Sequence, residues 1–269
     1  MSGFSADWLA LREPFDLKAR NAEVETAFEN ALPAGEVTVL DLASGAGSTV
    51  AALDQRLRAG GRSSLSWILT DNDAGLLGHA KDRYANVGTT RVSVRQADLA
   101  LELERLPFSD VDAVTTSAFL DLVDHRFVER LAGCVIAHRQ PFLASLSYDG
   151  RTQITPGHAY DTIVVEAVNR HQKTDKGFGA ALGPDAADFA IGLFQSAGLT
   201  VIRGHSDWLI PPGAAAIQME LISGWRAAAG EMDLAADLLS AWFEDRMRLV
   251  GEARLSIRVG HIDFAVMPS

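Results

Sequence analysis

The sequence is short of cysteine, of basic charge and of long apolar runs, and each shortage excludes a class of protein. Its one cysteine, Cys134, can form neither an intramolecular disulfide nor the paired CxxC ligands of a zinc or redox site. The 24 Lys and Arg residues stand against 35 Asp and Glu, which gives a formal net charge of −11 at pH 7. Because nucleic-acid binders take their affinity for phosphates from clustered basic side chains, we expect no nucleic-acid partner.

Segments that would enter a membrane are also missing. No stretch reaches the roughly 18 uncharged apolar residues of a membrane-spanning helix, and residues 1–14 lack the unbroken apolar segment of a signal peptide. We therefore expect a soluble, cytoplasmic protein with no membrane partner. The composition, with 48% hydrophobic and 22% charged residues, is that of a folded domain with a full core. It does not indicate an oligomeric state.

Short apolar runs alternate with amphipathic stretches along most of the chain. The runs are typical of buried strands, which we expect at 37–42, 66–70, 92–95, 113–116, 142–147, 199–203 and 255–266. The amphipathic stretches predict helices at 16–30, 51–57, 76–84, 120–132 and 186–197. This alternation predicts one α/β domain over residues 1–269, a doubly wound, mostly parallel sheet of seven strands with helices on both faces.

Two stretches are too long for a minimal version of this fold. Residues 148–184 separate the fifth strand from its helix, and residues 209–253 separate the last two strands. The second stretch predicts helices at 214–229 and 234–250. Because segments beyond the strand ends shape ligand pockets, we expect both insertions to form a cap over a substrate, with residues 1–34 as an N-terminal helical lid.

The loop after the first strand is the strongest functional signal. It reads Ala43-Ser44-Gly45-Ala46-Gly47-Ser48 and leads into a helix whose predicted N-cap is Ser48 or Thr49. In an open α/β sheet, ligands bind beyond the carboxyl ends of the strands, where glycine allows close approach of the backbone and the next helix presents free N–H groups. A small-residue loop alone is also compatible with a tight turn that binds nothing.

Acidic residues end the next two strands. Asp71 lies 71 − 47 = 24 residues after Gly47, where a carboxylate can accept hydrogen bonds from ribose hydroxyls. Asp98 ends the third strand and could reach an adenine amino group, while small residues at 116–118 leave room beside the sheet. Each acid alone could be a solvated loop residue or a helix cap. Together, on successive strand ends, they predict a nucleoside site.

The glycine spacing distinguishes between nucleosides. The dinucleotide pattern G-x-G-x-x-G is incomplete, because Val50 stands where its third glycine would be, and no phosphate-binding GxxxxGK[ST] motif occurs. The segment Asp41-x-Ala43-x-Gly45-x-Gly47 instead resembles the first motif of the class I S-adenosylmethionine-dependent methyltransferases, acid-x-Gly-x-Gly-x-Gly. Alanine replaces the first glycine, a mild departure unless that position needs a positive φ.

The resemblance implies S-adenosylmethionine as cofactor, S-adenosylhomocysteine as product, and a set of contacts. It places Asp71 at the ribose and Ser117 below the sulfonium. Arg20, on the predicted N-terminal helix, could meet the cofactor's carboxylate. The residues expected around the methionine part are Asp41, Ala43, Ser44, Gly45 and Gly47, and those expected at the adenine are Asn72, Asp98 and Leu99. No metal ion is expected.

The acceptor is predicted to be a small molecule. Methyltransferases that act on base amines or glutamine amides carry Asn/Asp-Pro-Pro-Tyr/Phe after strand four, where this chain has Thr116-Ser117-Ala118-Phe119. We expect O-methylation, with His171 as a candidate general base because its pKa suits proton transfer near neutral pH. His171 shares a helix face with apolar residues, so a core or helix-end role is equally compatible. Tyr148, directly after strand five, is a second candidate.

Lys173 and Lys176 favour an acidic or hydroxylated acceptor, although such runs are also typical of solvated loops. Trp208 could line an apolar acceptor pocket, whereas Trp225 and Trp242 have the helical spacing of core residues. Two other functions stay open on the sequence. One is an NAD(P)-dependent oxidoreductase, and the other is a non-catalytic, cofactor-binding interaction protein.

Overall fold

Strand β1 (Glu36–Leu42) lies at the centre of the sheet, and its side chains alternate between the two faces. Val37 and Val39 pack into one hydrophobic core, and Leu40 and Leu42 into another on the opposite face. The same alternation places Asp41 on the face of Val37 and Val39, where its side chain is fully buried. The computed structural model describes residues 5–62, 64–85, 87 and 90–268.

The strand order is β3-β2-β1-β4-β5-β8-β6. β1 to β5 run parallel, and β8 is antiparallel to both of its neighbours, β5 and β6. A short strand that the sequence analysis missed, β7 (Trp208–Ile210), pairs with β8. The predicted doubly wound, mostly parallel sheet is therefore confirmed. The other strands are β2 (Ser64–Asp71), β3 (Arg91–Gln96), β4 (Ala113–Ser117), β5 (Phe142–Thr155), β6 (Thr200–His205) and β8 (Ser256–Met267).

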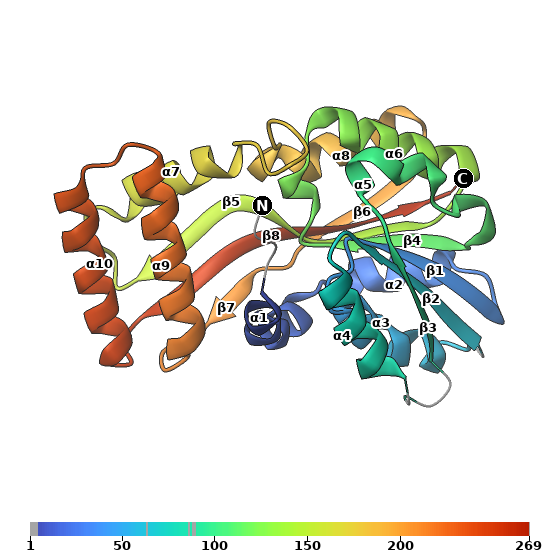
Figure 1. Cartoon of the computed structure of the whole chain (residues 1–269), viewed down its shortest axis with the longest axis horizontal. Coiled ribbons are helices and arrows are strands. Elements are labelled where there is room, and N and C mark those ends of the chain that lie inside the picture. Colours follow the sequence, from blue (N-terminus) through green and yellow to red (C-terminus); the bar gives the residue numbers. More distant parts are fainter. Residues whose placement is uncertain (1–4, 63, 86, 88–89, 269) are drawn as a thin grey trace.

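Helices cover both faces of the sheet (Figure 1). One core contains apolar residues of α2, α3 and α4, and the other contains those of α6 and α8. The bounds are α2 (Ala22–Ala31), α3 (Ser48–Ala59), α4 (Ala74–Tyr84), α5 (Leu99–Glu102), α6 (His125–His138) and α8 (Ala186–Ser196). Short 3-10 turns occupy Leu103–Arg105, Phe108–Asp110, Leu120–Leu122 and Gly183–Asp185. The predicted helix 120–132 starts later than expected, because Asp124 caps α6 by accepting a hydrogen bond from the backbone N–H of Phe127.

The predicted single helix over 16–30 is wrong. The structure has α1 (Ala6–Ala19) and α2, separated by Arg20 and Asn21. The Asn21 side chain accepts hydrogen bonds from the backbone N–H groups of Glu23 and Val24, so it caps α2 and prevents one continuous helix. The apolar residues on the two sides of the break therefore belong to two separate helices, α1 and α2.

Strand β5 runs to Thr155, well past the predicted end at Ser147. It continues because β8 pairs with it from Phe142↔Val266 to Thr155↔Ser256, with irregular register around Leu146 and residues 149–151. The extended halves of β5 and β8, together with β7, carry three helices at the far end of the molecule (Figure 1). We call these segments the cap lobe; its helices are α7 (Asp161–Gln172), α9 (Ala215–Glu231) and α10 (Ala236–Gly251).

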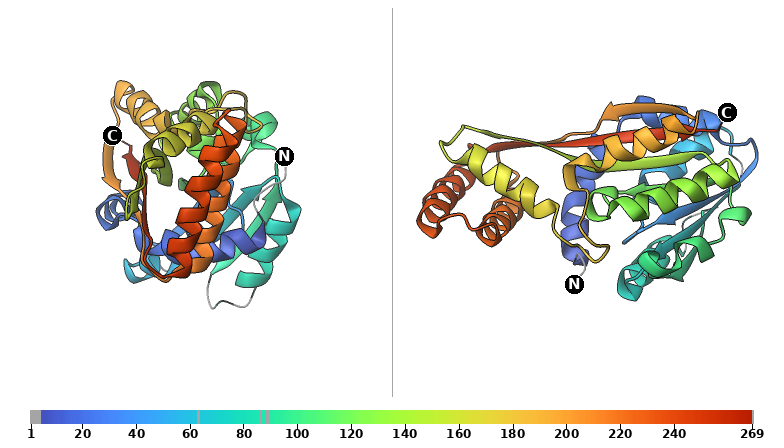
Figure 2. Two further views of the ribbon diagram at one scale, coloured as in Figure 1. Left: turned by 90° about the vertical axis from the view of Figure 1, so that its left-hand side faces the viewer. Right: turned by 90° about the horizontal axis from the view of Figure 1, so that it is seen from above.

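The two insertions predicted from the sequence lie together in this lobe and share a core that includes Val164, Ile222 and Trp242. Helix α1 lies between the cap lobe and the doubly wound part, where it contacts β7, α3 and α9 (Figure 2). The carboxyl ends of β1, β2 and β4 face this junction (Figure 1). Within the described ranges, none of the helices combines the length and apolar character needed to cross a bilayer.

Candidate active site

The loop after β1 takes a backbone conformation that favours glycine. Gly45 and Gly47 have φ angles of +52° and +81°, and Ala43 has +51°. The position therefore does need a positive φ, so alanine is not a mild replacement here, because an L side chain in the left-handed region costs roughly 1–2 kcal/mol. Two further positive φ values occur where β4 ends and within β5, at Ala118 and Leu146. Such strain collects at functional sites.

Gly47 also lies too close to a neighbouring ring for a side chain. A Cβ there would come within 2.9 Å of the Tyr84 ring, whose hydroxyl donates a 2.8 Å hydrogen bond to the Gly47 carbonyl. Gly47 is the N-cap of α3 and provides no capping side chain, so the predicted N-cap at Ser48 or Thr49 is wrong. The first-turn N–H groups of α3 therefore lack a side-chain cap, which is the arrangement that binds ligands at helix N-termini.

Asp41 is a fully buried carboxyl group behind this loop. Its Oδ1 accepts a 2.7 Å hydrogen bond from Thr115, while Oδ2 has no hydrogen-bond partner among the described residues. Burial raises the pKa of Asp41 to about 7, although Thr115 and Arg20 favour the ionised form. Thr49 also favours the ionised form of Asp41.

Arg20 reaches the same place from the break between α1 and α2. Its guanidinium donates hydrogen bonds to the hydroxyls of Ser145, at 3.1 Å, and Ser117, at 3.3 Å. The side chain is 3% exposed, and Nε has no partner within the described part of the chain. The structure thus brings together Arg20 and Ser117, which the sequence analysis placed in one site. We call Arg20, Asp41, Ser117, Ser145 and the 43–47 loop the loop cluster.

The acids at the ends of β2 and β3 border this cluster. Asp71 accepts hydrogen bonds from the backbone N–H groups of Gly45, at 2.9 Å, and Asp73, at 3.0 Å, so it ties the loop to β2. Asn72 and Asp98 are exposed at the same edge, and Leu99 is buried beside them. Asp98 caps α5 through a 3.0 Å hydrogen bond from the Ala100 N–H.

A second group of buried polar side chains lies beyond the loop cluster. Asp121, just after β4, is 7% exposed, and its Oδ1 lacks a partner among the residues that the structure describes. Burial raises the pKa of Asp121 to about 6, while Arg12 and the backbone N–H of Tyr148 favour the ionised carboxylate. The sequence analysis overlooked Asp121, although a lone acid inside the apolar run 119–123 is a readable signal.

His261 faces Tyr148 from the paired strand β8. It is 5% exposed, its ring centroid lies 6.2 Å from that of Tyr148, and its Nδ1 makes no hydrogen bond within the described residues. Burial lowers the pKa of His261 to about 3, and Arg12 adds to that effect, so the ring is neutral. Asp207 opposes this shift, as do the backbone carbonyls of Val259 and Ser206.

Helix α1 and Trp208 enclose these groups. The Trp208 ring lies 5.1 Å from that of His261 and 6.4 Å from that of Trp8, and its Nε1 donates to Asp16 at 3.0 Å. Arg12 stacks over Trp208 at 5.2 Å and forms a 2.8 Å ion pair with Asp16. We call Arg12, Asp121, Tyr148, Trp208 and His261 the Asp121 cluster.

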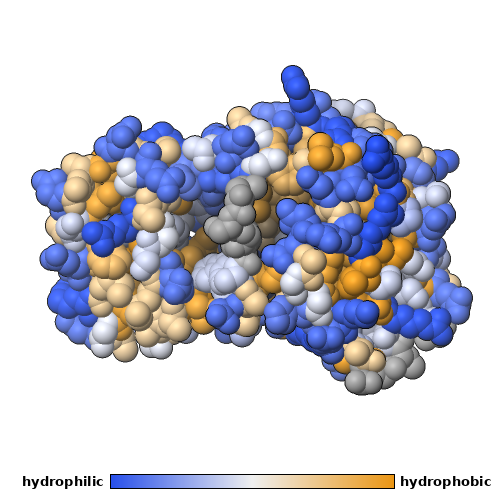
Figure 3. Space-filling model, in the orientation of Figure 1, coloured by the Kyte–Doolittle hydropathy of each residue, from blue (hydrophilic) through white to orange (hydrophobic). Residues whose placement is uncertain are grey.

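Helix α1 also covers the loop cluster. A Cβ on Gly45 would lie 3.3 Å from Leu9, and Glu13 forms a 2.7 Å ion pair with Arg83 of α4. In space-filling form the molecule is hollowed between the cap lobe and the doubly wound part (Figure 3). α1 therefore lies across both clusters at this hollow. Residues 1–4 of the predicted lid lie outside the described part.

The predicted general bases have partners within the cap lobe. His171 Nε2 lies 2.9 Å from a carboxylate oxygen of Glu231, and its Nδ1 lies 3.4 Å from Lys176. The Tyr148 hydroxyl donates to Asn169 at 2.7 Å, and burial raises the pKa of Tyr148 to about 12. To remove a proton from an acceptor, His171 would have to give up its contact with Glu231, and Tyr148 its hydrogen bond to Asn169. The structure brings Tyr148 beside Asp121 and places His171 at the end of α7.

The basic residues predicted to attract an acidic acceptor are already engaged. Lys173 forms a 2.6 Å ion pair with Asp185, and Lys176 donates to the hydroxyl of Thr174 at 3.0 Å. Burial lowers the pKa of Lys176, with Glu231 opposing that shift. Because the Lys173 ammonium is already paired with a carboxylate, it provides less attraction for an acidic acceptor. The prediction of an acidic acceptor therefore loses part of its support.

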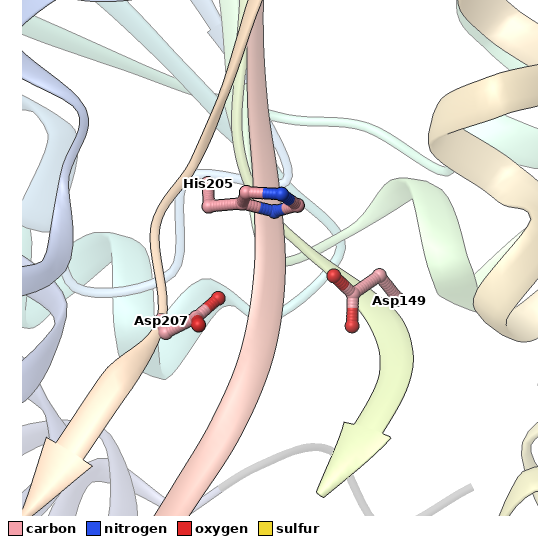
Figure 4. Close-up of side chains that lie close together, drawn as sticks. All are labelled: Asp149, His205 and Asp207. Carbon is pink, nitrogen blue, oxygen red and sulfur yellow. The ribbon is translucent and has the colours of Figure 1, made fainter.

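Asp149, His205 and Asp207 lie close enough together to resemble a metal site (Figure 4). Their ligand atoms lie within 4.8 Å of one another. However, the Arg151 guanidinium hydrogen-bonds to Asp149 at 2.7 Å, to Asp207 at 2.7 Å and to His205 at 3.0 Å. Arg258 adds a 2.8 Å ion pair to Asp207, so two arginines balance the two carboxylates, and we interpret the group as an ion-pair network that joins β5 to the β6–β7 connection.

Comparison with solved structures supports the architecture. The YcgJ protein of Bacillus subtilis aligns over 91% of this chain and 98% of its own, at 15% identity and a TM-score of 0.50. A candidate methyltransferase of Bacillus halodurans, BH2331, aligns over 93% of this chain and 100% of its own, at 16% identity and a TM-score of 0.51. The chain has the class I methyltransferase fold. No family model and no curated protein matches the sequence.

Proposed function

We propose that this protein is an S-adenosylmethionine-dependent methyltransferase that methylates a hydroxyl oxygen of a small molecule. The observation that carries the proposal is the set of buried, unpartnered polar atoms around the 43–47 loop. Asp41 Oδ2, Ser44 Oγ and Arg20 Nε have no hydrogen-bond partner among the described residues. Buried polar atoms are nearly always satisfied, so such a concentration at one strand end indicates that a ligand supplies the missing partners.

The residues present fit this cofactor. The buried guanidinium of Arg20 and the uncapped first turn of α3 suit a carboxylate, and Asp41 Oδ2 suits an ammonium group or a bound water. Asp71 suits the ribose hydroxyls, with Asn72, Asp98 and Leu99 at the adenine. When bound, the cofactor supplies a methyl group on a positively charged sulfur, so the chemistry needs no further electrophile.

The chain's own part is to position the acceptor and to exclude water. α1 lies over the loop and the Asp121 cluster, so we assign it the role of lid, and we assign the cap lobe the walls of the acceptor site. His171 and Tyr148 are the candidates for proton removal that the sequence provides. We also keep the sequence-based proposals of a cytoplasmic location and of no nucleic-acid partner.

An oxidoreductase is less compatible with the loop. The third glycine of the dinucleotide pattern allows a helix to pack closely against its strand. Here that position is Val50, which is 1% exposed and packs in the core between α3 and the sheet. A non-catalytic cofactor-binding protein shares the same loop, and methyl transfer to any metabolite would exclude it.

Calorimetry with S-adenosylhomocysteine tests the proposal. The wild-type protein should bind it, and Asp71→Ala should weaken binding at least tenfold, because the ribose loses its acceptor and the loop loses its tie to β2. Asp110→Ala, an exposed aspartate in a surface turn, is the matched control and should bind like the wild type. No heat of binding with either S-adenosylhomocysteine or S-adenosylmethionine would reject the proposal.

A further inference from the structure

The Asp121 cluster contains a second group of buried, unpartnered atoms near the strand ends. Asp121 Oδ1 and His261 Nδ1 lie on side chains that are at least nine-tenths buried, and neither atom has a hydrogen-bond partner in the described part of the chain. Tyr148 connects them, because the 120–122 turn that contains Asp121 contacts β5, and Tyr148 of β5 is paired with His261 at a ring distance of 6.2 Å. Two neighbouring polar groups without partners point to a second ligand.

Three strands lead from the loop cluster to this position. Along the chain Asp121 follows Ser117, and Tyr148 follows Ser145, where Ser117 and Ser145 are the two serines that bind Arg20. On the antiparallel strand β8, His261 lies two residues before Asp263, whose carboxylate accepts the backbone N–H of Leu146 at 2.7 Å. The Asp121 cluster is therefore the next layer outward on the same strand ends.

We propose that Asp121 and His261 bind the methyl acceptor, that this acceptor is an uncharged hydroxyl compound, and that Asp121 takes its proton. This inference rests on the proposed function. As the acceptor oxygen forms its bond to the methyl carbon, the carbon–sulfur bond breaks and its electron pair stays on sulfur. The hydroxyl proton passes to Asp121 Oδ1, which leaves a methyl ether, S-adenosylhomocysteine and a neutral carboxylic acid.

The charges around Asp121 favour an uncharged acceptor over an anion. Arg12 is the cation that faces Asp121, and it already pairs with Asp16 in α1. His261 is neutral, so Asp121 keeps a negative charge that would repel a carboxylate or phosphate. An amine is also disfavoured, because a carboxylate stabilises the protonated, non-nucleophilic ammonium form.

Asp121 suits proton removal better than the two residues predicted from the sequence. Its Oδ1 has no hydrogen-bond partner among the described residues, whereas the Tyr148 hydroxyl donates to Asn169 and His171 is bound to Glu231. A carboxyl group whose pKa is raised to about 6 by burial is still ionised at neutral pH and is a stronger base than an exposed one. The neutral His261 ring can donate to or accept from the same hydroxyl compound.

The test is binding of simple probes to the protein saturated with S-adenosylhomocysteine. Phenol, benzyl alcohol and benzoate, which share one benzene ring, are titrated into the wild type, Asp121→Asn and Asp188→Asn. Binding is followed by ligand-observed NMR. Asp188 serves as the control, because it is an exposed aspartate of α8 that forms an ion pair with Arg203 of β6. We expect both alcohols to bind wild type and the control at least tenfold more tightly than benzoate does, and Asp121→Asn to lose that preference.

The inference is overturned if benzoate binds as well as the alcohols, if neither alcohol binds, or if Asp121→Asn keeps the wild-type preference. Binding of S-adenosylhomocysteine shows whether Asp121→Asn is folded, and its affinity must lie within threefold of that of the wild type. If it does not, Asp121→Glu, which keeps the carboxylate, is tested instead. Loss of the preference for alcohols in Asp121→Glu would then overturn the inference. Failure of wild type to bind S-adenosylhomocysteine rejects the proposed function itself.

Discussion

The loop cluster and the Asp121 cluster lie side by side under α1, but they are built in different ways. The first depends on backbone shape: Ala43, Gly45 and Gly47 all have positive φ within five residues of one strand end. The second depends on side chains from distant segments, with Arg12 in α1 and His261 in β8, 261 − 12 = 249 residues apart. A binding loop made locally leaves a motif in the sequence, whereas a cluster of side chains brought together by strand pairing does not.

Substituting Gly47 should produce the largest effect, because it attacks the local backbone geometry directly. Gly47→Val places a β-branched side chain at φ +81° and against the Tyr84 ring. We expect no detectable binding of S-adenosylhomocysteine by calorimetry and a loss of about 2–4 kcal/mol in the free energy of unfolding. Gly78→Ala is the control: Gly78 lies in α4 with open space around it, and the change should leave binding intact. Wild-type affinity in Gly47→Val would show that the loop shape is dispensable.

Arg20 belongs to the loop cluster but comes from the break between α1 and α2, outside the motif. Arg20→Met removes a buried cation that bonds to Ser117 and Ser145 and lies 4.0 Å from Glu25. We expect S-adenosylhomocysteine to bind 10- to 100-fold more weakly, roughly the 1.4–2.8 kcal/mol of a charged hydrogen bond. The exposed Arg126→Met should bind normally. An unchanged affinity in Arg20→Met would show that Arg20 does not contact the cofactor.

Both clusters bury a carboxyl group of raised pKa, so both should respond to pH. Asp41 titrates near 7 in the folded protein against 3.8 as its ordinary value, so between about pH 4 and 7 the folded state holds a proton that the unfolded state has lost. This contribution to stability is present at low pH and disappears as the pH rises through 7. Asp41→Asn should therefore stabilise the protein at pH 8 by about 1–3 kcal/mol in urea denaturation, and by less at pH 5. Equal effects at both pH values would contradict the raised pKa.

Ligand binding at Asp41 has the opposite pH dependence, because folding favours the protonated carboxyl group and the ligand favours the ionised one. A ligand that donates to Oδ2 prefers the ionised carboxylate, so affinity for S-adenosylhomocysteine should increase from pH 6 to pH 8 and then level off. Asp41→Asn should bind more weakly at pH 8 and should lose this part of the pH dependence. Calorimetry of both proteins at three pH values gives the comparison.

Ala43→Gly should have the smallest effect and the opposite sign from Gly47→Val. Glycine removes the strain at φ +51° but adds entropy to the unfolded chain, so we expect a net gain of about 0.5 kcal/mol and unchanged cofactor binding. Ala80→Gly, in the buried part of α4, should instead destabilise by about 1 kcal/mol. Thermal denaturation of the pair decides the matter, and a loss of stability in Ala43→Gly would mean that the alanine methyl packs favourably there.

The sequence was informative where structure is local. The apolar runs located β1 to β4, and the spacing of Asp41, Gly45 and Gly47 indicated the binding loop, because each depends on a few consecutive residues. The errors arose where a contact from elsewhere overrides the pattern. The helix over 16–30 is broken by the Asn21 cap, and β5 continues past Ser147 because β8 pairs with it. The N-cap error has the same origin, since Gly47 is held by Tyr84 from another helix.

By itself, the sequence determined the doubly wound α/β fold, the loop after β1 and the acids at the next strand ends, since periodicity and short-range motifs encode them. Only the tertiary structure decided that Arg20 contacts Ser117, that Asp41 Oδ2 has no hydrogen-bond partner among the described residues, and that Asp121, Tyr148 and His261 come together beneath α1. These contacts depend on strand order, on the pairing of β5 with β8 and on burial. Burial, in turn, sets which carboxyl groups can hold a proton near neutral pH.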